Sequence, residues 1–174
     1  MAAAQPAPAR SQAAVVAAMC DPSFYGLAGP VERKETHISH VFLVGERAYK
    51  LKKELVLPFV DYGTLERRLF FCREEMRLNR PLAPSVYRGV RAVVATASGL
   101  ALADEDDPDA LEYVVEMQRF READTLASYV SEGRCGPALT RRVGAHLAAF
   151  HAAALSPEPS TVGTLAARVA SDLE

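Results

Sequence analysis

The sequence predicts an α+β fold in which an antiparallel sheet carries one long helix and further helices follow. Two pairs of β-rich segments, each joined by a short turn that contains glycine, predict two hairpins. One long helical segment, which a proline ends, separates the hairpins. Alanine-rich segments that favour helix come after the last strand, so the order is strands, helix, strands, helices.

The composition is typical of a soluble globular protein of one domain or slightly more. The chain has 174 residues, of which 49% are hydrophobic and 24% charged. Its net charge of -2 argues against a nucleic-acid partner, and no apolar run approaches the roughly 20 residues of a membrane span. Three cysteines lie far apart and form no disulfide framework, which favours a cytoplasmic location.

The first elements are a short helix over residues 11–19 and a hairpin of two strands, 40–44 and 47–53. Gly45-Glu46 separates the strands. Glycine at the first position of a two-residue loop favours a type II′ turn, because that position needs a positive φ.

The long helix is expected over residues 65–80. Thr64 precedes it as the N-cap, and Glu66 lies near the positive end of the helix dipole. Pro81 ends it, because proline has no N–H and its ring clashes with the preceding turn. Cys72 lies on the apolar stripe of this helix.

The second hairpin joins residues 90–96 and 100–103 through Ala97-Ser98-Gly99, and a third strand-like run covers 111–118. Helices are then expected over 125–132 and 138–154.

The turn at Gly45-Glu46 fixes the register of the first hairpin. It pairs Leu43 with Ala48 and Val41 with Lys50. Because side chains alternate along a strand, these four residues share one face. That face is apolar and carries one ammonium group.

Lysine is concentrated at this hairpin. Lys50, Lys52 and Lys53 are three of the four lysines in the chain, whereas arginine supplies the other sixteen basic residues. A compact, flexible ammonium suits a phosphate group. The alternative is that the three lysines protect an exposed edge strand from pairing with other chains.

Glu75 falls inside the apolar arc of the long helix. A carboxylate buried there without a partner costs several kcal/mol, so a cation is expected beside it. Lys50 on the preceding hairpin is the predicted partner. Arg68, seven residues before Glu75 on the same helix, is the alternative.

The sequence Arg47-Ala48-Tyr49-Lys50 resembles the third-strand motif of protein kinases, and the helix with its inward glutamate follows as it does there. Together with residues 35–39, 65–68 and 78–80, it resembles the bacterial aminoglycoside phosphotransferase-like family. The similarity is to the branch often fused to a P-loop ATP-binding domain, and it runs from about residue 31 to residue 151.

The resemblance implies a protein-kinase-like N-lobe, with an antiparallel sheet plus one long helix, followed by the first helices of an incomplete helical C-lobe. Residues 1–30 would be a disordered or short helical extension, residues 31–120 the N-lobe with its hinge, and residues 121–174 the start of the C-lobe.

The resemblance also implies the roles of particular residues toward ATP and Mg²⁺. Lys50 would orient the nucleotide phosphates and Glu75 would position Lys50. Ala48, with Val41 or Leu43, would cover the adenine, and the backbone from Met117 through Gln118 to Phe120 would bind its edge. The turn from Thr36 to Ser39 would lie above the phosphates, where kinases have a glycine-rich loop that this sequence lacks.

No His-x-Asp loop with a following Asn lies between His151 and Glu174, and the chain has no GxxxxGK[ST] motif. We therefore expect the amino-terminal part of a longer ATP-dependent phosphotransferase, whose catalytic loop, metal ligands and small-molecule acceptor site lie elsewhere. An apolar face left for the second lobe would favour dimerisation. The alternative is a non-catalytic kinase-like module that binds nucleotide or a protein partner.

Overall fold

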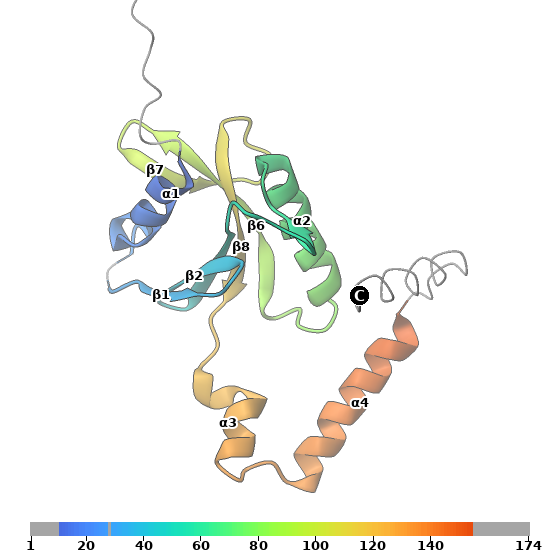
Figure 1. The fold of residues 1–174 in the computed structure, drawn as a ribbon. Helices are drawn as coiled ribbons and strands as arrows, with labels where there is room; N and C mark the ends of the chain where they lie inside the picture. The colour runs from blue at the N-terminus through green and yellow to red at the C-terminus, as the bar shows by residue number, and fades with distance from the viewer. Residues whose placement is uncertain (1–10, 28, 155–174) are drawn as a thin grey trace, which may run out of the picture. The chain divides into compact units, whose positions relative to one another are not determined.

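A six-stranded antiparallel sheet with helices on both faces forms the body of the first part of the chain, in a computed structural model that describes residues 11–27 and 29–154 (Figure 1). The strand order is β1-β2-β3-β8-β6-β7. Their bounds are β1 Glu32–Glu35, β2 Ser39–Val44, β3 Arg47–Lys52, β6 Tyr87–Thr96, β7 Gly99–Ala103 and β8 Ala110–Gln118. A separate small hairpin pairs β4 (Val56–Leu57) with β5 (Val60–Asp61).

Four α-helices lie within the described residues, which confirms the predicted α+β class. They are α1 (Gln12–Met19), α2 (Leu65–Asn79), α3 (Leu126–Ser131) and α4 (Pro137–Ala153). Two short 3-10 turns, η2 (Pro22–Tyr25) and η3 (Glu122–Asp124), accompany them. The chain divides into two compact units, residues 1–124 with the sheet and residues 125–174 with α3 and α4. Among the helices described, none has the length and apolar character that crossing a membrane requires.

The first hairpin has the predicted register. Val44 lies opposite Arg47, Leu43 opposite Ala48 and Val41 opposite Lys50. Gly45 has a φ of +50°, as the first position of the predicted turn requires. β3 lies between β2 and β8 and is therefore not an edge strand. The alternative in which the lysines of this strand protect an exposed edge is wrong.

Strand β1 and the β4–β5 hairpin were not predicted from the sequence. All four residues of β1 are charged and exposed, so the segment shows no apolar alternation. It pairs with β2 at one edge of the sheet, where charged side chains discourage pairing with other chains. The strands of the small hairpin have two residues each, too few for a periodic pattern.

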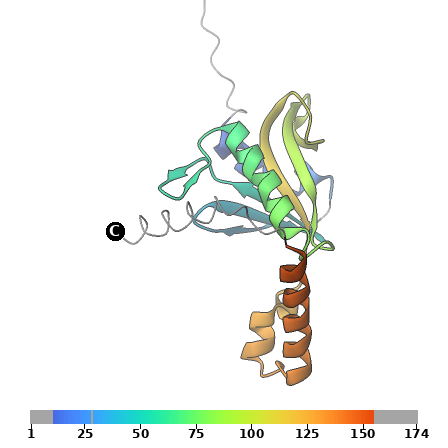
Figure 2. The same cartoon turned by 90° about the vertical axis from the view of Figure 1, so that its right-hand side faces the viewer.

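Two apolar clusters pack on opposite faces of the sheet. On one face α1 places Val15 and Met19 against Phe42 and Leu51 of the first hairpin. On the other face α2 places Cys72 against strands β6 and β8. The two views show α1 and α2 on either side of the sheet (Figures 1 and 2). The short helix predicted over residues 11–19 is present and completes the core of the first unit.

The start of α2 also agrees with the sequence. Thr64 has an extended backbone, and its hydroxyl accepts a hydrogen bond from the Arg67 N–H at 3.3 Å, so it is the N-cap. Leu65, Leu69 and Met76 pack with Cys72 against the sheet. This packing fixes the position of α2 along the sheet, and with it the place where Glu75 reaches β3.

Cys72 gives a direct test of this packing. Burial between α2 and the sheet raises the pKa of its thiol to about 12, whereas Cys20 and Cys135 are exposed. Because the thiolate is the nucleophile, we expect iodoacetamide at pH 8 to label Cys72 far more slowly than the other two cysteines. Peptide mass spectrometry measures the three rates, and urea should make them similar. Equal rates in the folded chain would contradict the docking of α2.

Candidate functional site

Glu75 of α2 meets two lysines of β3. The Nζ atom of Lys50 lies 2.9 Å from Glu75 Oε1, and the Nζ atom of Lys52 lies 2.8 Å from Glu75 Oε2. The predicted contact between Lys50 and Glu75 is therefore present. Lys52 was missed as a partner, although it is two residues from Lys50 and strand alternation places both lysines on one face.

The two lysines differ in exposure. The side chain of Lys50 is 29% exposed, whereas that of Lys52 is 4% exposed and its ammonium lies 5.2 Å from the centre of the Tyr62 ring. Lys52 is thus fixed between Glu75 and an aromatic face. Lys50 can reach a ligand from the position in which Glu75 holds it.

The mutual attraction of Glu75 and Lys52 outweighs the effect of their burial. Burial alone would raise the pKa of Glu75, but Lys52 and then Lys50 hold it below its usual value. Burial alone would lower the pKa of Lys52, but the Glu75 carboxylate raises it. Both groups therefore remain charged at neutral pH, and the site carries two ammonium groups for one carboxylate.

An apolar surface adjoins Lys50. Ala48 lies opposite Leu43 on β2 and opposite Met117 on β8, and Val41 lies opposite Lys50. Ala48 is buried, whereas Val41, Leu43 and Met117 are only partly covered. The predicted sharing of one face by these side chains is confirmed. The arrangement offers a flat apolar group a surface next to an ammonium.

The turn between β1 and β2 is closed by hydrogen bonds between Thr36 and Ser39. The Thr36 N–H donates to the Ser39 carbonyl at 2.9 Å, and the Ser39 N–H donates to Thr36 Oγ1 at 3.0 Å. The Ser39 side chain is fully buried, opposite Lys52 in the register. Thr36 and His37 are the exposed residues of the turn, so they are better placed than Ser39 to touch a ligand from outside.

Two backbone amides at the end of β8, which were expected to bind the edge of an adenine ring, donate hydrogen bonds within the fold instead. The Gln118 N–H donates to the Val86 carbonyl at 2.7 Å, and the Arg119 N–H donates to the Glu46 carbonyl at 2.9 Å. The expectation that the Gln118 amide binds a ligand therefore conflicts with a hydrogen bond of the fold. The acceptors lie far away in sequence, Val86 in the segment before β6 and Glu46 in the turn between β2 and β3, so the sequence pattern could not show these hydrogen bonds.

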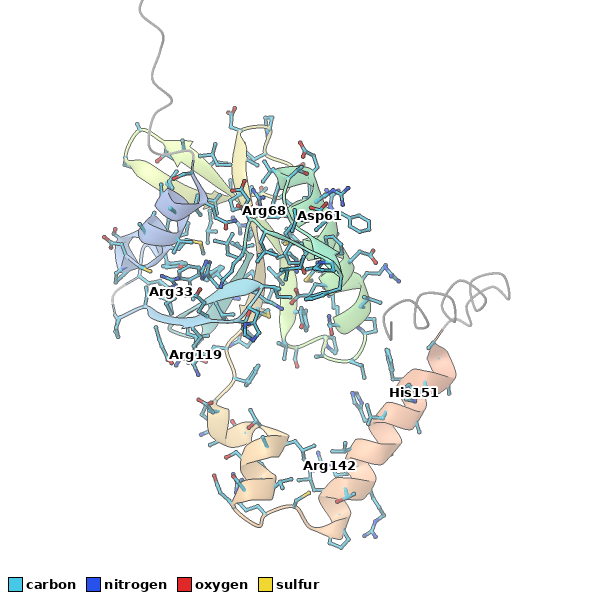
Figure 3. All side chains as sticks on the ribbon, viewed as in Figure 1. Arg33, Asp61, Arg68, Arg119, Arg142 and His151 are labelled. Carbon is cyan, nitrogen blue, oxygen red and sulfur yellow. The ribbon has the colours of Figure 1, made fainter. Side chains whose placement is uncertain are left out.

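A second buried ion pair lies near this site. Arg68, which Figure 3 labels, belongs to α2. Its Nε donates to Glu112 Oε1 of β8 at 2.8 Å, and its Nη1 donates to the Tyr62 carbonyl at 2.9 Å. Gln12 of α1 donates to Glu112 Oε2 at 2.7 Å. The alternative in which Arg68 is the partner of Glu75 is wrong. Glu112 lies within an apolar run, so the argument that identified Glu75 applied to it as well.

Comparisons with known proteins find similarity to three mycobacterial proteins. They are named uncharacterized protein Mb2027c of Mycobacterium bovis and uncharacterized proteins MT2060 and Rv2004c of Mycobacterium tuberculosis. Each is 35% identical over 121 residues, which cover 70% of this chain and 22% of the relative. No family model matches the chain, and no solved structure matches it. The matched region of this chain thus spans about a fifth of the length of these relatives, whose names state no activity.

Proposed function

We propose that this chain is the ATP-binding lobe of an aminoglycoside phosphotransferase-like small-molecule kinase. The complete protein would transfer the γ-phosphate of ATP to a hydroxyl group. The observation that carries the proposal is the 2.9 Å contact between Lys50 of β3 and Glu75 of the following helix. An antiparallel sheet plus one long helix is also the arrangement of a protein-kinase-like N-lobe.

Each group of the site has a role in this proposal. Lys50 donates to phosphate oxygens, since its ammonium is partly exposed and an ammonium binds phosphate as a point charge. Glu75 orients Lys50, and Lys52 holds Glu75 from the buried side. The apolar surface of Val41, Leu43 and Ala48 covers the adenine ring.

The catalytic carboxylate, the Mg²⁺ ligands and the acceptor site are assigned to other parts of the complete protein. Within the described residues, no group of three or more His, Cys, Asp or Glu side chains is arranged to hold a metal ion. The relatives are several times longer than the region that this chain matches. We propose the cytoplasm as the location, since Cys20, Cys72 and Cys135 are free thiols.

Calorimetric titration with ATP tests the role of Lys50. We expect Lys50→Met to weaken binding by roughly tenfold or more, because a hydrogen bond to a charged group is lost. Lys53→Met is the matched control, since Lys53 contacts Glu35 instead of Glu75. Its affinity for ATP should stay within about twofold of the unchanged chain. The proposal fails if the chain does not bind ATP or if both variants bind it equally well.

An assay of phosphoryl transfer with a full-length relative distinguishes the proposed kinase from a non-catalytic module that only binds nucleotide. Under the proposal, the lysine that corresponds to Lys50 is required for transfer of the γ-phosphate. Binding of ATP that depends on this lysine, without transfer to any tested alcohol or sugar, would favour the nucleotide-binding module.

A further inference from the structure

A depression of about 690 Å³ lies outside the Lys50 site, and arginine side chains dominate its lining. Arg47 of β3 and Glu116 of β8 contribute to it, with Arg88 and Arg91 of β6. Arg80, which caps the end of α2, lines it as well. Arg47 and Glu116 alternate with Ala48 and Met117 along their strands, so they point to the other face of the sheet.

Three guanidinium groups share the Glu116 carboxylate. Arg47 Nη1 lies 3.2 Å from Glu116 Oε1, Arg88 Nε lies 3.6 Å from the same oxygen, and Arg91 Nη1 lies 4.0 Å from Oε2. The carboxylate is only 15% exposed. Of the three contacts, only that of Arg47 lies within hydrogen-bond distance, and the Arg88 and Arg91 distances are too long for a hydrogen bond to Glu116.

The lining therefore has an excess of positive charge and of hydrogen-bond donors. Four arginines face one glutamate among the lining residues, and Asp104 approaches only Arg91, at 3.8 Å. Arg47 Nη1 is shielded from solvent, and its 3.2 Å ion pair with Glu116 lacks the geometry of a hydrogen bond. Arg88 Nη1 has a long contact of 3.4 Å with Gln118 Oε1. An acceptor that entered the depression would meet donors from several directions.

We propose that this depression binds a phosphate group. Guanidinium groups match the oxygens of phosphate with paired donors and remain charged at all physiological pH values. A phosphate dianion offers more acceptors and more charge than a second carboxylate, and both properties suit three unbalanced guanidinium groups. The group can belong to inorganic phosphate or to a small phosphate monoester, and the two sources share this chemistry.

Calorimetry with inorganic phosphate, at an ionic strength held constant with sodium chloride, tests the site in the whole chain. We expect saturable binding that Arg88→Gln weakens roughly tenfold, because one charge-assisted hydrogen bond is lost. Arg67→Gln is the control, since Arg67 is exposed on α2 and contacts Asp61. Lys50→Met should also leave this binding unchanged, which separates the depression from the proposed ATP site.

Glu116→Gln should strengthen phosphate binding, whereas Arg88→Gln should weaken it. Removing the carboxylate frees the three arginines and abolishes repulsion of the anion, so phosphate should bind about tenfold more tightly. Glycerol phosphate is titrated in parallel, and the tighter ligand identifies the source of the phosphate group. The proposal is overturned if phosphate shows no saturable binding, if Arg88→Gln behaves like Arg67→Gln, or if Lys50→Met abolishes binding. Circular dichroism must show that each variant is folded.

Discussion

Arg68→Met is expected to destabilise the first unit by about 3 to 5 kcal/mol, the cost of leaving a buried charge without its partner. The Glu112 carboxylate is 1% exposed and would retain only the neutral donors Gln12 Nε2 and the Tyr113 N–H. Methionine keeps most of the apolar volume of arginine, so the loss of stability reports the missing charge together with the hydrogen bond from Arg68 Nη1 to the Tyr62 carbonyl. Urea unfolding at pH 7, followed by circular dichroism, measures the change in the free energy of unfolding.

Two further variants isolate the ion pair. Arg67→Met removes the neighbouring arginine, which is 56% exposed and pairs with Asp61, and should cost less than about 1 kcal/mol. The double variant Arg68→Met, Glu112→Met removes both buried charges and should recover much of the stability. Equal losses for Arg67→Met and Arg68→Met would show that Glu112 does not depend on Arg68.

Glu75→Met is expected to have an effect of similar size, about 3 to 5 kcal/mol. The ammonium of Lys52 would then be buried beside Tyr62 without a carboxylate. Lys50 would also lose its contact at 2.9 Å, so affinity for ATP should fall together with stability if the proposed function is right. Urea unfolding and ATP titration on the same protein measure the two effects.

The loss of stability in Glu75→Met should depend on pH in a defined direction. The lysines hold the pKa of Glu75 below its usual value of 4.5 in the folded chain. The ionised carboxylate therefore stabilises the fold above pH 4.5, and this contribution is lost as the pH falls through the folded pKa. The difference between the unchanged chain and Glu75→Met should shrink below pH 4.5. A constant difference from pH 7 to pH 3 would contradict the ion pair.

The sequence was sufficient where a single local rule applied. Gly45-Glu46 specifies both the turn and the pairing partners, so the position of Lys50 followed from it. Thr64 and Pro81 bound α2, and helical periodicity then placed Glu75 among apolar residues. The contact between Lys50 and Glu75 could be predicted because each residue is fixed by its own element and buried charges require partners.

The sequence was insufficient where a contact depends on the whole sheet. Arg68 could be assigned to Glu112 only after β8 was known to lie beside β3 and under α2. The use of the Gln118 amide by the Val86 carbonyl depends on how the segment before β6 crosses the end of β8. β1 has the composition of a solvated loop, and only its pairing with β2 makes it a strand.

The position of α1 affects how this chain should be cut for expression. A fragment that started at residue 31 would lose Val15 and Met19 and leave Phe42 and Leu51 in water. It would also lose Gln12, whose side chain bonds to the Lys52 carbonyl and to Glu112. Such a fragment should precipitate or unfold, and recombinant versions should therefore begin before Ser11.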